Sequence, residues 1–306
     1  MSKHPSSLVS LIVAAVATAA LAAPAAAKVK VVATVPDLAA LVAEVGGKQV
    51  EVTSMSLATQ DPHFVDAKPS LIVKLNKADL LVAIGLDLEV GWLPKLQTSA
   101  RNGKILTSGS GFLDCSTAVH VLDVPTAKVD RSMGDVHPQG NPHYLYDPRA
   151  AAQCAKAIAA KLGAIDSGNA KAYAANAAAF VARLDKARAG WEARMKPYRG
   201  TKIITYHKSW DYLNDWLGLV ELETLEPKPG VPPSPGHVAD VLKAGRAAGA
   251  KVVIQESYYP DKVGALVAKK LGGAAVVLPG GTDIGAGERY LDHVERVVTA
   301  LEAALK

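Results

Sequence analysis

The chain has little of what marks several large classes of protein. Its 306 residues include two cysteines and only 5% aromatic residues, and its formal net charge of +5 is modest. Lysine and arginine are scattered, without a basic run and with few aromatic residues beside them. Nucleic-acid-binding surfaces gather basic residues on one face, so we expect no nucleic acid partner.

Several catalytic and nucleotide-binding motifs are also absent. The sequence contains no H-E-x-x-H zinc motif, no G-x-S-x-G nucleophile motif and no Walker pattern. Its Gly-Gly pairs, at 46–47, 272–273 and 280–281, are typical of helix ends or turns. Neither a phosphate-binding loop nor one of these hydrolase sites is therefore expected.

The first 27 residues have the pattern of a secretory signal peptide. Lys3 and His4 precede an apolar run over residues 8–23, and Ala25-Ala26-Ala27 forms a small-residue cleavage site. No cysteine follows that site, which argues against lipid anchoring there, and no later apolar stretch reaches the ~20 residues needed to span a membrane. We predict cleavage after Ala27 and a soluble product exported to the periplasm.

The two cysteines, Cys115 and Cys154, are the only candidates for a disulfide. An even number of cysteines in an exported protein permits such a bond. The alternative is two unpaired thiols. Both remain open at this point, because the sequence does not reveal the Cα separation on which the bond depends.

Strand-like and helix-like segments alternate in both halves of the chain. β-branched or continuously apolar runs predict strands in the first half over residues 28–34, 49–55, 79–84, 104–107 and 118–122. The second half has predicted strands over residues 202–206, 220–224, 251–255 and 274–278. Alternation of strands with helices is typical of a mostly parallel sheet flanked by helices, so we predict an α/β fold.

A long helical tract lies between the two halves. Residues 169–198 are rich in Ala, Lys and Arg and contain no glycine before Gly190, which predicts one helix of roughly 45 Å. We interpret this helix as a rigid connection between two α/β lobes, residues 28–168 and residues 199–306. The alternative is a helix that covers only one sheet.

Four side chains with metal-binding chemistry follow predicted strands. His63, His143 and His207 lie in the loops beyond strands, and Asp283 lies in the loop after the last one. In open α/β sheets, ligands bind outside the carboxyl ends of the strands. Two sheets that face each other would bring these side chains together, and three imidazoles with one carboxylate suit tetrahedral Zn²⁺.

The segments around these positions carry a resemblance to a known family. They are Asp61-Pro62-His63, residues 78–82 followed by Gly85, Asn141-Pro142-His143, Asp147-Pro148, His207 after its strand, Pro233-Ser234-Pro235, Glu256, and Thr282-Asp283 with Tyr290-Leu291. With them, the mature chain resembles, end to end, the periplasmic solute-binding proteins of metal-ion ABC importers of the zinc/manganese cluster. The resemblance implies two lobes joined by one long helix, and a permease of the inner membrane as partner. It also implies that His63, His143, His207 and a carboxylate are the metal ligands.

Two further side chains have open roles. Zinc-binding members often carry a long His- and acid-rich loop before the second ligand histidine, but here residues 123–137 are only moderately polar and hold His137 alone. His137 is either an auxiliary metal-capture residue or a solvated loop histidine. Glu256, at a strand end, is either an alternative fourth ligand or a hydrogen-bond acceptor for a ligand imidazole.

The predicted function is that of a monomeric binding protein that captures Zn²⁺ between its lobes and delivers it to the permease. Manganese-binding members tend to carry a glutamate where this chain has His207, so the zinc branch is favoured over a manganese- or iron-binding one. The alternative from another class is an exported zinc metalloenzyme. A catalytic zinc normally has three protein ligands and an open position, so four protein ligands argue against an enzyme.

Overall fold

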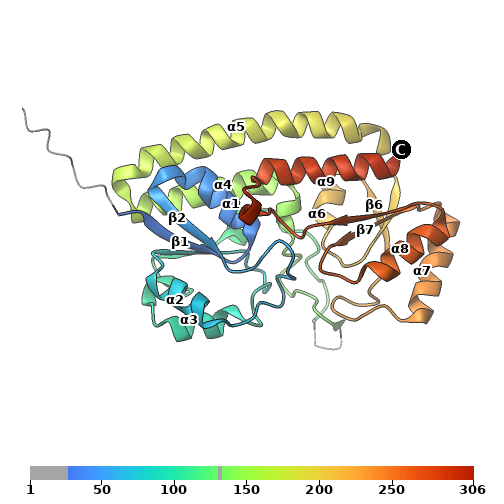
Figure 1. The fold of residues 1–306 in the computed structure, drawn as a ribbon, viewed down its shortest axis with the longest axis horizontal. Helices are drawn as coiled ribbons and strands as arrows, with labels where there is room; N and C mark the ends of the chain where they lie inside the picture. The colour runs from blue at the N-terminus through green and yellow to red at the C-terminus, as the bar shows by residue number, and fades with distance from the viewer. Residues whose placement is uncertain (1–26, 130–132) are drawn as a thin grey trace, which may run out of the picture.

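The computed structural model describes residues 27–129 and 133–306, and it contains two lobes of similar architecture (Figure 1). Each lobe has a four-stranded parallel sheet, in the order β2-β1-β3-β4 in the first and β6-β5-β7-β8 in the second. The predicted α/β fold with two parallel sheets is thereby confirmed. The predicted signal peptide, residues 1–27, lies outside the described residues except for Ala27.

The first lobe has a central strand that is buried along its whole length, as expected where helices cover both faces of a sheet. Its strands are β1 (Val29–Ala33), β2 (Val50–Ser54), β3 (Leu80–Ala83) and β4 (Phe112–Asp114). Its helices α1 (Pro36–Gly46), α2 (Pro69–Lys77) and α3 (Leu93–Ala100) each have a proline at their start, where the missing N–H leaves no hydrogen bond unmade.

The second lobe repeats this alternation. Its strands are β5 (Lys202–Thr205), β6 (Val220–Thr224), β7 (Val252–Glu256) and β8 (Ala274–Leu278). Its helices are α6 (Asp211–Leu217), α7 (Pro235–Ala248), α8 (Asp261–Leu271) and α9 (Tyr290–Leu305). Helices α6, α7 and α8 each end at a glycine with left-handed backbone, the conformation that satisfies the last carbonyls of a helix.

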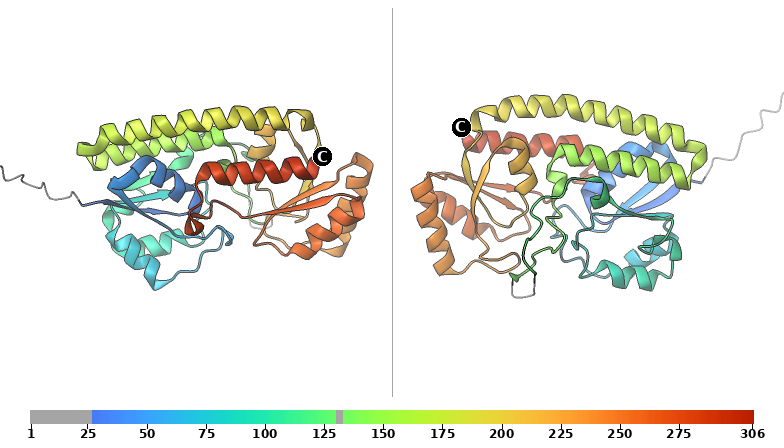
Figure 2. Two further views of the ribbon diagram at one scale, coloured as in Figure 1. Left: turned by 45° about the horizontal axis from the view of Figure 1, so that its top comes forward. Right: turned by 180° about the vertical axis from the view of Figure 1, so that it is seen from behind.

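A long helix runs from the first lobe to the second. Helix α4 (Pro148–Ile165) is followed by α5 (Ala170–Met195), a helix of 26 residues. Figures 1 and 2 show α5 running across both lobes with α9 alongside it, and the rings of Phe180 and Tyr290 meet between these two helices at 6.3 Å. The predicted long helix is confirmed, although 3₁₀ turns replace its predicted ends. No helix in the described ranges combines the length and apolar character needed to cross a bilayer.

Two of the predicted strands are wrong. Residues 104–107 fall on a 3₁₀ turn, Gly103–Ile105, because the side chain of Asn102 accepts a hydrogen bond from the Lys104 backbone and starts a turn there. Residues 118–122 alternate in character, but the edge of the sheet is taken by β4 instead. Leu122 instead contacts the second lobe, since its N–H donates to the hydroxyl of Tyr212 in α6.

The two cysteines are free thiols in this structure, and both are fully buried. Cys115 lies in a 3₁₀ turn after β4, and Cys154 lies in α4. The neighbouring Cys154 thiol and burial together raise the pKa of Cys115 well above its usual value. The two thiols are therefore close neighbours, and the disulfide between them stays a prediction.

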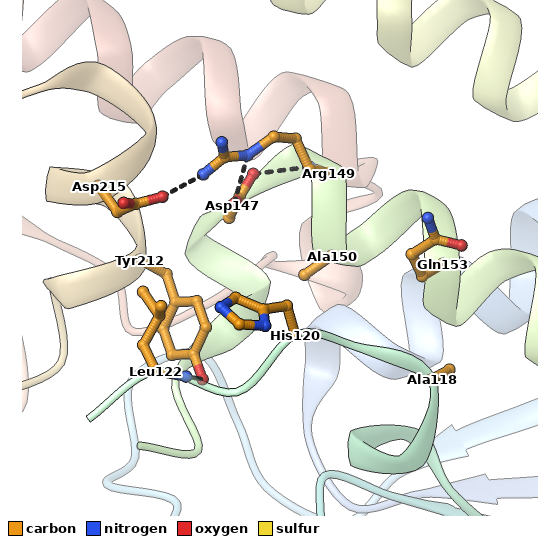
Figure 3. A pocket seen from close by; sticks show the side chains of 9 residues that line it. All are labelled: Ala118, His120, Leu122, Asp147, Arg149, Ala150, Gln153, Tyr212 and Asp215. Atoms are coloured by element: carbon orange, nitrogen blue, oxygen red, sulfur yellow. Dashed lines mark hydrogen bonds and ion pairs between the residues drawn. The ribbon is translucent and has the colours of Figure 1, made fainter. Parts of the chain in front are cut away.

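Side chains and backbone join the lobes along a seam. The Tyr212 hydroxyl accepts from Leu122 N at 2.9 Å and donates to the Asn141 carbonyl at 2.8 Å. Arg149, at the start of α4, reaches Asp215 of α6 at 2.6 Å (Figure 3). A cavity of about 320 Å³ lies beside these contacts. These hydrogen bonds between the lobes fix their relative position.

Removing the Tyr212 hydroxyl tests this seam. Tyr212→Phe leaves the Leu122 N–H and the Asn141 carbonyl without their partner, so we expect a loss of roughly 1–3 kcal/mol in the free energy of unfolding. Chemical denaturation measures it. Tyr198→Phe is the control, since the Tyr198 hydroxyl makes no hydrogen bond to the described residues. Equal stability of the two variants would show that the seam contact contributes nothing.

Candidate metal centre

Two of the predicted histidines are placed by the same local device. In Asp61-Pro62-His63 and in Asn141-Pro142-His143, the side-chain oxygen of the first residue accepts a hydrogen bond from the histidine N–H, at 2.9 Å in both. Such a turn fixes the backbone two residues on, and the proline between stiffens it. His63 is thus presented from the loop after β2 and His143 from the stretch after β4.

The same asparagine also ties the first lobe to the second. Its side-chain nitrogen, Asn141 Nδ2, donates to the Lys208 carbonyl and to Asp211 Oδ2, each at 2.8 Å. Lys208 follows His207, which lies just past β5. The turn that presents His143 is therefore bonded directly to the segment that presents His207.

Four histidines converge where the lobes meet. One nitrogen from each of His63, His137 and His143 lies within 4.8 Å of the other two. The ring of His207 lies against this group, with its centre 5.2 Å from that of His63 and 5.5 Å from that of His143. The structure therefore brings together the three predicted ligand histidines and adds His137 to them.

The spacing of the closest pair fits a shared metal ion. His63 Nε2 and His137 Nε2 are 3.2 Å apart. Two nitrogens bound to one tetrahedral zinc at about 2.0–2.1 Å lie ~3.3 Å from each other. The Nε2 atom of His143 is buried and has no hydrogen-bond partner among the described residues, which is costly unless a ligand completes it.

Two carboxylates orient two of the rings. Asp61 Oδ1 accepts from His63 Nδ1 at 2.7 Å, and Glu226 Oε2 accepts from His207 Nδ1 at 2.7 Å. A neutral ring that donates through Nδ1 has a bare lone pair at Nε2, and this arrangement is usual behind metal-bound histidines. Both rings are thereby held in the tautomer that can bind a metal.

The titration behaviour of the rings agrees with a metal-binding role. Burial, together with the neighbouring His63 and His207 imidazoles, lowers the pKa of His137 to about 3. The same causes lower the pKa of His143 well below its usual value. Burial also opposes a charged His207, but the hydrogen bond to Glu226 raises its pKa overall. His137 and His143 are therefore neutral near pH 7, the form that metal ions require.

The two predicted carboxylates, Asp283 and Glu256, do not belong to the group of close metal-binding side chains. Asp283 is exposed, and its Oδ1 accepts from Ala286 N at 3.2 Å within its own loop. Glu256 is fully buried, and this burial raises its pKa to about 7. No imidazole in the described part of the chain donates to it. Glu226 makes the contact with an imidazole that was one of the two roles considered for Glu256.

Sequence reasoning missed Glu226 and the roles of Asp61 and Asn141. Glu226 lies two residues beyond β6, just as His207 lies two residues beyond β5. The strand-end rule that selects the histidines could therefore have selected Glu226 as well. The repeated pattern of an Asx residue, proline and histidine was a second available signal.

The chain belongs to the family described as zinc-uptake complex component A, periplasmic, whose model matches residues 31–304. Its members are metal-binding solute-binding proteins of ABC importers, so the chain is a transport binding protein and not an enzyme. The alternative of an exported metalloenzyme is thereby set aside.

Relatives with known names bind different metals. The manganese ABC transporter substrate-binding lipoprotein PsaA of Streptococcus pneumoniae is 28% identical over 217 residues, which cover 69% of this chain and 67% of that protein. The zinc-binding protein AdcA of Streptococcus pyogenes is 24% identical over 258 residues, which cover 82% of this chain. The match spans about half the length of AdcA, 50%, and of the PsaA of Streptococcus mitis, 49%.

Solved structures share the fold. A crystal structure of ZnuA is 22% identical, with a TM-score of 0.77 and coverage of 91% of this chain and 100% of that one. A Mn-bound periplasmic metal binding protein from Candidatus Liberibacter asiaticus is 20% identical, with a TM-score of 0.74 and coverage of 90% and 99%. At these identities the likeness concerns the fold, and the choice of metal has to be argued from the ligands.

Replacing the two buried glutamates separates their roles. Glu226→Ala removes the acceptor that orients His207, so we expect zinc affinity to fall roughly 10–100-fold. Glu256→Ala is the control, because Glu256 is also buried but does not hold an imidazole. Competition with a zinc chelator measures both dissociation constants, and circular dichroism confirms folding. An equal or larger loss for Glu256→Ala would contradict the assignment.

Proposed function

We propose that the chain captures Zn²⁺ outside the cytoplasm and delivers it to an ABC permease of the inner membrane. The observation that carries the proposal is the convergence of four imidazoles from two lobes, two of them oriented by carboxylates. Export through the signal peptide at residues 1–27 and action as a monomer belong to the same proposal.

The ligand set that we propose is His63, His137, His143 and His207. The fourth position goes to His137 rather than Asp283, because His137 Nε2 is 3.2 Å from His63 Nε2 while Asp283 is exposed and bonded within its own loop. His137 would then be a full ligand, which is more than the auxiliary role considered from the sequence. Asp283 remains the alternative if metal binding draws its loop inward.

Zinc is favoured over manganese by the chemistry of the ligands. Imidazole nitrogen suits zinc, whereas manganese, like magnesium and calcium, is held mainly by oxygen. The carboxylates of Asp61 and Glu226 accept hydrogen bonds from the Nδ1 atoms of His63 and His207. They therefore contact the rings on the side away from the proposed metal. This leaves a nitrogen-rich site in which Zn²⁺ can satisfy its tetrahedral preference.

The size of the cavity also supports an ion as cargo. The cavity lined by His137, His143 and His207 holds about 50 Å³. Pockets for organic ligands usually enclose roughly 300–1,000 Å³. A second hollow, of about 370 Å³, is lined in part by His63 and His137. An ion fits the inner cavity, and an organic solute does not.

Direct competition tests the choice of metal. Metal-free mature protein, offered equal concentrations of Zn²⁺ and Mn²⁺, should retain one zinc per chain and almost no manganese, because four imidazoles bind zinc more tightly. Elemental analysis after gel filtration gives the result. His143→Ala combined with His207→Ala is the control and should lose zinc retention. Retained manganese, or unchanged zinc in the double variant, would contradict the proposal.

A further inference from the structure

A tight turn of the second lobe lies against the segment that carries His137. We call residues 228–231 the Gly230 turn and residues 134–138 the His137 strap. The turn closes with a hydrogen bond from Val231 N to the Lys228 carbonyl at 2.9 Å, and Gly230 has a φ of 76°. Proline before a glycine with positive φ is the pattern of a type II turn, which only glycine fits without strain.

The turn and the strap are in backbone contact. Asp135 N in the strap donates to the Pro229 carbonyl in the turn at 2.9 Å. A Cβ atom added at Gly134 would lie 2.3 Å from the Pro229 oxygen, and one added at Gly230 would lie 2.1 Å from Asp135 Oδ2. At Gly134 the clash would be with a backbone carbonyl, so the close approach of the two backbones requires glycine there. At Gly230 the clash would be with the Asp135 carboxylate, and glycine is favoured by the positive φ.

The same turn is connected to His207 through one carboxylate oxygen. Glu226 Oε2 accepts from His207 Nδ1 at 2.7 Å and from Gly230 N at 3.0 Å. Glu226 is only 5% exposed, so both hydrogen bonds are shielded from water and hold their partners firmly. One buried oxygen thus fixes the ring of His207 and the turn that touches the strap.

We propose that the Gly230 turn is the positioning element that sets His137 against the metal, and that Glu226 couples the placement of His137 to that of His207. Only Val136 separates the bonded Asp135 from His137, so a displaced strap must displace the ring. The inference rests on the proposed function, because it takes His137 as a zinc ligand. It assigns a role in metal binding to residues that do not touch the metal.

A double-mutant cycle tests the coupling. Gly230→Ala strains the turn at its positive φ and crowds the Asp135 carboxylate in the strap. It should therefore displace the strap and weaken zinc binding roughly 10–100-fold, as loss of a supporting contact does at metal sites. His137→Ala should weaken it by a similar factor, and the double variant should lose little more, since both changes remove the same ligand. Chelator competition gives the affinities, and the visible absorption of the Co²⁺-loaded protein reports how many ligands surround the metal.

Two further variants keep the result interpretable. Gly249→Ala is the matched control, because Gly249 also has a positive φ, 72°, but a Cβ there meets no atom within 4 Å. Gly249→Ala should carry the same backbone strain as Gly230→Ala but leave zinc affinity unchanged. Gly134→Ala approaches the same contact from the strap side, and it replaces Gly230→Ala if that variant does not fold.

The outcomes distinguish this inference from the function on which it rests. If the wild-type chain binds no zinc, the proposed function fails and the inference fails with it. If His137→Ala leaves affinity and the Co²⁺ spectrum unchanged, His137 is no ligand and the inference is wrong while zinc binding stands. If His137→Ala weakens binding but the glycine variants do not, or if their effects multiply in the double variant, the turn does not position His137.

Discussion

Imidazoles can lie against one another away from water only if most of them are neutral and their bare nitrogens face a shared positive charge. The site meets the first condition, and the proposed metal ion would meet the second. Burial keeps His137 and His143 neutral, and the carboxylates of Asp61 and Glu226 take the outward nitrogens of His63 and His207. The inward nitrogens are left for the metal ion that we propose, and the surrounding hydrogen bonds hold the rings in place.

The ligands come from both lobes, so the relative position of the lobes sets the geometry of the site. Asn141 shows how closely the two are linked, since its backbone carbonyl accepts from Tyr212 while its side chain supports His143 and bonds to the segment after His207. Helix α5 runs without a break across both lobes. A site assembled from such a fixed seam is already close to the spacing that a metal ion requires.

The fold and part of the site could be predicted from the sequence for clear reasons. The buried parallel strand β3 is a continuous apolar run, and the carboxyl-end rule selects His63, His143 and His207. The contacts of His137 could not be predicted, because they depend on the Gly230 turn. This turn is distant in sequence and meets the His137 strap only in the folded chain. The short strands at residues 104–107 and 118–122 were wrong because a side-chain cap and a cross-lobe hydrogen bond overrode local propensity.

The central claim is that a metal ion is held by four imidazoles, with His137 in the fourth position. A crystal structure of the zinc-loaded protein, with anomalous diffraction recorded at the zinc absorption edge, tests it most directly. The account predicts one zinc peak about 2.0–2.1 Å from a nitrogen of each of His63, His137, His143 and His207, with Glu226 still bonded to His207. A peak whose fourth ligand is an oxygen of Asp283 or Glu256, with His137 turned away, would contradict it.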